Sequence, residues 1–395
     1  MSRARAVELA GYLSASVGVG EAARGYVGAM RSVGIGVLAH DVPLPGRDPA
    51  GAVVRQGPAP EASAVGANLL CLNPEQMLPF LAGPDAPITA GRSTVGIWSW
   101  EVDVLPPGWR EAAAGLSEVW TYSRFSAELI GAGVGVPVHS VPPPVTAPRA
   151  PAAPPIELPA GFNVLIMFDF LSTLERKNPL GAIAAYRDAF APGDGVSLIV
   201  KSVNGRHRPE QLAAVTAAIA GRPDIVLVDR TMTGPERDAL IAACDCFLSL
   251  HRSEGHGLPI AEAMACGRIV VATGYGGNTE FMTEENAYPV AWRPARVGPG
   301  VEHYPQDATW AEPDRASAVA LLREACKDRD RAARRARRAQ ADLERTLSPA
   351  AVGARIAERL RALDAAREAR PARPGSRARA ALGQVVARAQ RVVRP

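Results

Sequence analysis

The sequence is poor in cysteine, lacks metal-ligand spacings and has no long apolar run. Its five cysteines are irregularly spaced over 395 residues, and Cys244-x-Cys246 has the wrong spacing for a zinc knuckle. We therefore expect reduced core thiols in a cytoplasmic protein, and no bound metal. Nowhere do 18 apolar residues follow one another, and the first residues, MSRARAVELAGYL, contain no stretch of signal-peptide length. We expect neither a membrane span nor export by that route.

The chain also lacks a strong overall charge, but its end is basic. The formal net charge is +4, whereas residues 361–395 carry nine arginines against Asp364 and Glu368, which leaves about −3 for the first 360 residues. Two interpretations of the tail stay open. It forms a short basic amphipathic helix around 377–394 that contacts an anionic membrane at the inner face, or it is an Ala/Arg-rich end without a partner. No aromatic residues accompany these arginines, so we expect no nucleic-acid binding.

The length exceeds that of one ordinary hydrophobic core and predicts two domains. A proline-dense stretch at 142–160 indicates an extended linker. Apolar strand-like runs alternate with helical patterns on both sides of it, which predicts two doubly wound parallel sheets with ligands at the carboxyl ends of their strands. We assign residues 1–141 to an N-terminal Rossmann-like domain and 161–345 to a second one. A helix at 346–366 is expected to pack back on the first, and 367–395 form the basic tail.

The segment HRSEGHGLPIAEAMACGR (251–268) carries most of the functional information. Glu254 and Glu262 stand with seven residues between them, and the intervening stretch begins with a Gly-His-Gly sequence followed by Leu258 and Pro259. The apolar run before it predicts a buried strand, and the proline starts a helix. A strand that turns through glycines into a helix presents free backbone N–H groups, which bind phosphate. Carboxylates on either side suit the hydroxyl groups at the two ends of a sugar nucleotide.

This motif resembles the E-x7-E motif of family 4 glycosyltransferases, which are retaining enzymes of the GT-B fold. Further similar segments are distributed over residues 11–314: 11–37, 95–109, 117–125, 168–186, 274–282 and 309–314. The resemblance implies an α/β protein with two Rossmann-like domains that face a cleft, in which residues 1–141 form the acceptor side and residues 161–345 bind the donor. It also implies a nucleoside-diphosphate sugar as donor, with neither a cofactor nor a metal.

The resemblance assigns roles to individual residues. Glu254, Arg176 and Lys177 are the expected catalytic residues, with the two cations stabilising the leaving diphosphate. Cations at a helix start oppose the helix dipole, which we read as a sign of function. Glu262 is expected to hold the ribose, and Asp229 the nucleobase region. The remaining expected donor-binding residues come from the glycine-rich turns and the start of the helix: Gly18, Gly20, Gly255, His256, Gly257, Leu258, Gly276, Gly277 and Asn278.

The chain departs from the resembled pattern at two positions. The related branch usually has Ser where Gly276 stands. Many members carry a histidine after the fourth strand, where this chain reads Trp98-Ser99-Trp100-Glu101. Glu101 or Asp103 is therefore expected to face the acceptor instead.

The sequence thus predicts a retaining, metal-independent hexosyltransferase. It would transfer a sugar to a saccharide or lipid-linked acceptor in polysaccharide or glycoconjugate synthesis. Two alternatives stay open, a catalytically silent nucleotide-sugar-binding partner of another transferase and a GT-B sugar-nucleotide epimerase. The sequence names neither the sugar, the base nor the acceptor.

Overall fold

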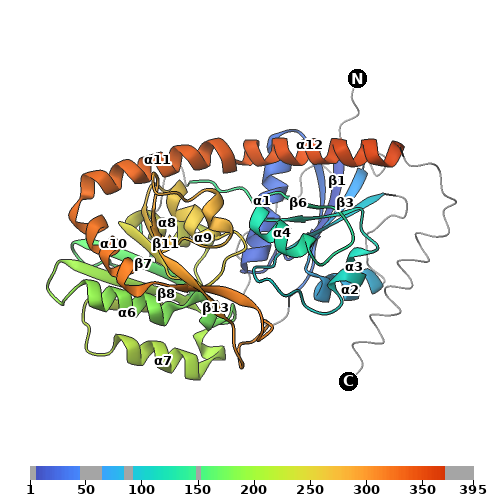
Figure 1. The fold of residues 1–395 in the computed structure, drawn as a ribbon. Helices are drawn as coiled ribbons and strands as arrows, with labels where there is room; N and C mark the ends of the chain where they lie inside the picture. The colour runs from blue at the N-terminus through green and yellow to red at the C-terminus, as the bar shows by residue number, and fades with distance from the viewer. Residues whose placement is uncertain (1–5, 45–64, 84–91, 148–152, 370–395) are drawn as a thin grey trace. The chain divides into compact units, whose positions relative to one another are not determined.

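The computed structural model describes residues 6–44, 65–83, 92–147 and 153–369. The chain forms two compact units. The first comprises residues 1–100, 105–144 and 346–395, and the second comprises 101–104 and 145–345 (Figure 1). The expected helix at 377–394 lies outside the described residues. Within the described part, no helix combines the length and the apolar character needed to cross a bilayer.

The first unit contains a six-stranded parallel sheet in the order β2-β1-β3-β4-β5-β6. Its elements are β1 (Ala6–Gly11), α1 (Gly18–Ser32), β2 (Gly36–Asp41), β3 (Val65–Cys71), α2 (Pro74–Ala82), β4 (Ser93–Trp98), α3 (Trp109–Ala113), β5 (Glu118–Thr121), α4 (Arg124–Gly131), β6 (Val138–Ser140) and α12 (Pro349–Glu368). The central strands are nearly continuous apolar runs because a parallel sheet is covered on both faces.

The second unit contains another six-stranded parallel sheet in the order β12-β11-β10-β7-β8-β9. Helices α6 and α7 cover one face, and α8 and α9 cover the other (Figure 1). The elements are β7 (Phe162–Asp169), α5 (Leu174–Lys177), α6 (Pro179–Ala189), β8 (Val196–Val203), α7 (Pro209–Ile219), β9 (Ile225–Asp229), α8 (Gly234–Ala243), β10 (Cys246–Ser249), α9 (Leu258–Ala265), β11 (Ile269–Thr273), β12 (Tyr288–Val290), α10 (Arg315–Lys327) and α11 (Arg329–Leu347). The two sheets confirm the predicted α/β class.

The strand order of the second sheet reverses between β7 and β10. From β7 the chain proceeds outward through β8 and β9, and it then returns to place β10 on the other side of β7. The loops that follow β7 and β10 therefore leave the same edge of the sheet side by side. Ligands of doubly wound sheets bind at such a switch point. This topology brings residues 170–178 close to residues 250–257.

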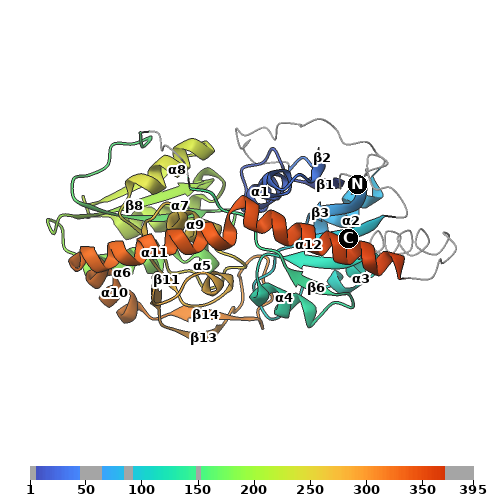
Figure 2. The same cartoon turned by 90° about the horizontal axis from the view of Figure 1, so that it is seen from above.

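Several elements were not predicted from the sequence. An antiparallel hairpin, β13 (Trp292–Arg296) with β14 (Thr309–Pro313), lies outside the six-stranded sheet (Figure 2). Its first strand reads WRPAR, in which proline and arginine are not strand signals. The four-residue α5 was also missed, because so short a helix has no periodicity.

Two parts of the chain belong to a unit other than the one next to them in sequence. Helix α12 packs on α1, and Gly353 of α12 lies against the backbone carbonyl of Ala29 with no room for a Cβ. Arg359 of α12 also donates to Glu118 of β5 at 2.6 Å. Residues 101–104, which follow β4, belong to the second unit. The expected boundary at residue 141 had placed them with the first.

The five cysteines are all free thiols. Cys71, Cys244 and Cys246 are buried, and burial raises the pKa of Cys244 to about 12. These thiols are packing residues rather than nucleophiles.

Candidate active site at the edge of the second sheet

The candidate site lies where the loops after β7 and β10 meet. Asn178 joins them: its side-chain amide donates to the carbonyl of Leu250 at 2.8 Å, and its oxygen accepts from the N–H of Gly181 at 3.2 Å. The N–H of Arg252 donates to the carbonyl of Arg176 at 2.7 Å. Asn178 adopts a left-handed conformation between α5 and α6, with φ of 51°. These bonds fix the basic pair that precedes Asn178 against the loop that carries Glu254.

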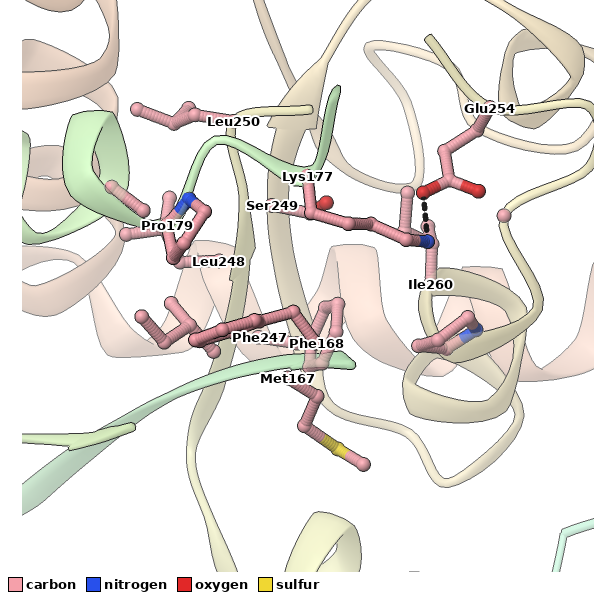
Figure 3. A pocket seen from close by; sticks show the side chains of 14 residues that line it. Met167, Phe168, Lys177, Pro179, Phe247, Leu248, Ser249, Leu250, Glu254 and Ile260 are labelled. Atoms are coloured by element: carbon pink, nitrogen blue, oxygen red, sulfur yellow. Dashed lines mark hydrogen bonds and ion pairs between the residues drawn. The ribbon is translucent and has the colours of Figure 1, made fainter. Parts of the chain in front are cut away.

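Lys177 and Glu254 form an ion pair at this junction. The Lys177 ammonium donates to Oε1 of Glu254 (Figure 3). Nη1 of Arg176 lies 3.4 Å from the same oxygen. One carboxylate oxygen thus interacts with two cations, while the side chains of Lys177 and Glu254 are only 16% and 11% exposed. Charges so well shielded from water interact strongly.

The cations decide the protonation state of Glu254. Burial alone would raise the pKa of this carboxyl group, but Lys177, Arg176 and His251 outweigh burial and lower it to about 2. Burial lowers the pKa of Lys177, and the Glu254 charge opposes that decrease. Burial lowers the pKa of His251 to about 4, so this imidazole is neutral at pH 7. Glu254 is therefore a carboxylate at neutral pH, which suits a charge-stabilising group and excludes a general acid.

The guanidinium of Arg176 is occupied by the protein itself. Nη1 donates to the carbonyl of Ser253 at 3.0 Å, and Nη2 donates to the Ser172 hydroxyl at 2.9 Å and to the Ser172 carbonyl at 3.3 Å. Nε lies 3.3 Å from Oε1 of Glu101. Arg176 is 7% exposed, and these partners surround its planar fork. Of the two predicted cations, Lys177 is thus less engaged with the protein backbone.

The helix-dipole argument for the basic pair was wrong. The sequence predicts Arg176 and Lys177 at the start of a helix, but they occupy the last turn of α5, and α6 begins only at Pro179. Cations are favourable at a helix C-terminus. The dipole therefore gives no separate reason for a catalytic role.

Glu101 and Asp103 lie in the second unit, next to the hairpin loop. The Glu101 carboxylate accepts a hydrogen bond from the Tyr304 hydroxyl, and its backbone carbonyl accepts from the Ser253 hydroxyl at 2.5 Å. Asp103 accepts from the N–H of Thr309 at 2.7 Å. Burial raises the pKa of the Tyr304 hydroxyl well above its usual range, so this group remains a donor. Tyr304 was not predicted, because no pattern in the sequence links it to Glu101.

The loop from Glu254 to α9 has the predicted turn into a helix. Gly257 caps α9 in a left-handed conformation, with φ of 86°. Leu258 is the first helical residue of α9. The backbone N–H groups of a first helical turn have no partner within the helix, so they can donate hydrogen bonds to an anion. Gly255 and His256 are buried between Glu254 and this cap, and the His256 ring lies 5.2 Å from that of Phe281.

Glu262 is the fifth residue of α9. Its carboxylate lies 3.2 Å from Nη2 of Arg237 on α8, and the Glu262 side chain is 14% exposed. A ribose that bound this carboxylate would do so beside the arginine.

The glycine turn after β11 packs on the backbone of Glu254. The N–H of Gly277 donates to the Glu254 carbonyl at 2.8 Å. A Cβ on Gly276 would lie 2.7 Å from that same carbonyl oxygen, and Gly276 has φ of 92°. The buried Asn278 anchors the turn by donating to the Thr273 carbonyl at 2.9 Å. Because only glycine fits here, the difference from the usual Ser follows from the packing of this chain.

The predicted nucleobase-side residue, Asp229, and the neighbouring Lys201 are engaged in internal hydrogen bonds. Asp229 accepts from the Ser202 hydroxyl at 2.9 Å and from the Gly205 N–H at 3.1 Å. Lys201 is buried and donates to the carbonyls of Ser202 and Arg230 at 2.7 and 2.6 Å. Burial lowers the pKa of Lys201 to about 8. Both side chains hold the ends of β8 and β9 together.

Gly18 and Gly20 lie in the first unit, at the start of α1. A Cβ on Gly20 would collide with the carbonyl of Tyr12 and lie 2.9 Å from that of Ala15, whereas a Cβ on Gly18 would meet nothing within 4 Å. Gly20 is therefore required by packing, whereas Gly18 is exposed and has room for a side chain.

A cavity of about 20 Å³ lies beside the Lys177–Glu254 pair, among apolar side chains such as Phe168, Phe247 and Ile260 (Figure 3). This volume holds about one water molecule. A sugar nucleotide would have to bind outside it. In the described part of the chain, no three His, Cys, Asp or Glu side chains are grouped as metal ligands.

Comparisons with known proteins relate one part of the chain to a glycosyltransferase family. Residues 178–296 match the family model described as "Glycosyl transferases group 1". No curated protein matches the sequence.

Among solved structures, the chain is similar to HepE of Anabaena in complex with UDP and glucose, with a TM-score of 0.60, 14% identity and coverage of 91% of this chain and 100% of that one. It is also similar to sucrose-phosphate synthase of Thermosynechococcus elongatus, with a TM-score of 0.62, 13% identity and coverage of 92% and 100%. A third similar structure is a glycosyltransferase of Rickettsia africae, with a TM-score of 0.62, 13% identity and coverage of 92% of this chain and 99% of that one. At these identities the likeness shows the fold, which is GT-B.

We predict that Glu254 links stability to acid pH. The pKa of its carboxyl group is about 2 in the folded chain and 4.5 ordinarily, so its contribution is complete above pH 4.5 and is lost as the pH falls toward 2. The free energy of unfolding of Glu254→Gln should lie on the order of 3 kcal/mol below wild type at pH 7, and the gap should narrow below pH 4.5. Urea titrations at several pH values measure it. The exposed Glu284→Gln is the control, and a gap that stays constant down to pH 2.5 would contradict the pairing.

Proposed function

We propose that this chain is a retaining, metal-independent glycosyltransferase. It transfers a hexose-type sugar from a nucleoside-diphosphate sugar to a saccharide or lipid-linked acceptor in polysaccharide or glycoconjugate synthesis. The observation that carries the proposal is the buried Lys177–Glu254 pair, which the second sheet holds at its switch point next to the start of α9. The family-model match over residues 178–296 supports it.

Lys177 is the residue best suited to the diphosphate. As the bond between the anomeric carbon and the phosphate oxygen breaks, the leaving diphosphate gains negative charge, which a nearby ammonium and the N–H groups at the start of α9 stabilise. In the structure this ammonium donates to Glu254. Donor binding therefore replaces one anionic partner of Lys177 by another. The site supplies this positive charge from its own residues.

Glu254 acts on the sugar. Its carboxylate is ionised at neutral pH, so it accepts hydrogen bonds from sugar hydroxyls and stabilises positive charge at the anomeric carbon. The acceptor oxygen forms its bond to the anomeric carbon on the face from which the diphosphate departs. Its proton passes to the leaving phosphate oxygen. Configuration is thereby retained.

UDP-sugars are the first donors to test. HepE, which has the same fold, was solved with UDP-glucose. The side chains of Asp229 and Lys201 are engaged within the protein. Recognition of the base in this region would therefore use backbone groups.

Substitution of the ion pair tests the proposal. Lys177→Ala and Glu254→Ala should each reduce sugar transfer about 100-fold or more, because each removes a group that acts on developing charge. A thermal-shift screen with UDP-, GDP- and ADP-sugars first identifies the donor, which stabilises the folded chain by mass action. Transfer or hydrolysis of that radiolabelled donor is then measured, with the exposed Glu284→Gln as control. Near-wild-type rates in both alanine variants would refute the site. Donor binding without turnover in wild type would favour the silent-partner alternative.

Glu101→Gln should shift the basic limb of the pH–activity profile to lower pH. Burial lowers the pKa of Lys177, and the charge of Glu101 is one of the interactions that raise it. Loss of this charge lowers the Lys177 pKa further, so the active ammonium form is lost earlier as the pH rises. The profile of kcat/KM against pH in wild type, Glu101→Gln and Glu284→Gln measures the shift. An unchanged basic limb would mean that Glu101 does not act on Lys177.

A further inference from the structure

Trp292 is exposed in a protein that buries its other tryptophans. All six tryptophans lie in the described residues, and five of them are at most 6% exposed. Trp292, on the outer hairpin, is 40% exposed. A ring of this size that remains in water does not contribute the stabilisation that its burial would give. A single exposed apolar residue needs no explanation by itself, but Trp292 has an aromatic partner.

The partner is Tyr275, whose ring centroid lies 4.6 Å from that of Trp292 at an interplanar angle of 57°. Tyr275 is half-buried between two glycines. A Cβ on Gly274 would lie 3.9 Å from Cδ1 of Trp292, and a Cβ on Gly276 would lie 2.7 Å from the carbonyl oxygen of Glu254. The aromatic pair is therefore tied to the turn that packs on Glu254. Packing therefore fixes the position of Tyr275 and Trp292 relative to the candidate site.

A carboxylate accompanies the two rings. Asp103 is exposed and is held by the N–H of Thr309, which pairs with Arg296 at the other end of β13. Burial raises the pKa of Tyr275, and the charge of Asp103 adds to that increase. The hairpin face thus offers aromatic rings at one end and a hydrogen-bond acceptor toward the other.

This combination matches the chemistry of a saccharide with more than one pyranose unit. One face of a sugar ring consists of C–H groups that pack on the negative face of an aromatic ring, and its edge carries hydroxyls that donate to carboxylates. We propose that Tyr275, Trp292 and Asp103 form a subsite for the saccharide part of the acceptor. Trp292 packs beside Gly274, whereas Gly276 on the other side of Tyr275 contacts Glu254, so the rings suit a sugar unit beyond the donor sugar. The proposal rests on the proposed function and extends it to the acceptor.

Saturation-transfer difference NMR tests the subsite without turnover. The full chain is mixed with UDP and, in turn, with maltotriose, cellotriose and chitotriose. Ring C–H protons of at least one trisaccharide should receive saturation in wild type. The signal should fall at least fivefold in Trp292→Ala and recover in part in Trp292→Phe, which restores an aromatic face. Arg293→Ala, a change of the adjacent exposed residue, is the matched control and should keep the signal.

Calorimetric titration with UDP and with UDP-glucose separates acceptor from donor. A subsite for the acceptor predicts that the Kd of each nucleotide changes less than twofold in Trp292→Ala. A selective loss of UDP-glucose affinity would assign the subsite to the donor sugar and overturn the proposal. So would the absence of any trisaccharide signal in wild type, or a signal unchanged in Trp292→Ala. Failure of wild type to bind any nucleotide sugar would instead refute the proposed function.

Discussion

The ion pair between Lys177 and Glu254 is the interaction on which the candidate site depends. It joins the loops after two strands that are adjacent in the sheet but far apart in sequence, and it is shielded from water. Removing one partner of such a pair leaves a buried charge uncompensated, which is costly. The same pair keeps Glu254 ionised. A ligand that replaces Glu254 as the partner of the Lys177 ammonium must carry comparable negative charge, as a diphosphate does.

Arg176 and Glu101 hold this ion pair in place and do not form a second ligand-binding pair. Arg176 donates to Ser172 and Ser253 and lies between the carboxylates of Glu101 and Glu254. Two cations and two carboxylates therefore balance within the site. Tyr304 completes the support from the hairpin loop. A site that is neutral before ligand binding avoids leaving unpaired charge in a low-dielectric environment.

Short sequence patterns predicted the strands and turns whose formation depends on residues adjacent in the sequence. The run FNVLIMF became β7 and IVLVD became β9, because a parallel strand is buried on both faces and needs a continuous apolar sequence. The turn through Gly257 into α9 followed from glycine and proline chemistry. The motif predicted Glu254 as a site residue, and the structure places this carboxylate beside Lys177.

Long-range features escaped prediction. Glu101 and Tyr304 are 203 residues apart, and no periodicity connects them. Residues 101–104 belong to the second unit, where Glu101 and Asp103 accept hydrogen bonds from Ser253 and Thr309, residues far away in the sequence. Arg176 appeared equivalent to Lys177 in the sequence. The structure distinguishes the two, because the guanidinium of Arg176 is engaged in hydrogen bonds within the protein.

A crystal structure of the full chain with UDP tests the central claim most directly. The account predicts that the Lys177 ammonium leaves Glu254 and donates to the diphosphate, which rests at the start of α9, while Arg176 keeps its bonds to Ser172 and Ser253. A diphosphate bound elsewhere, with the Lys177–Glu254 pair still closed, would contradict it.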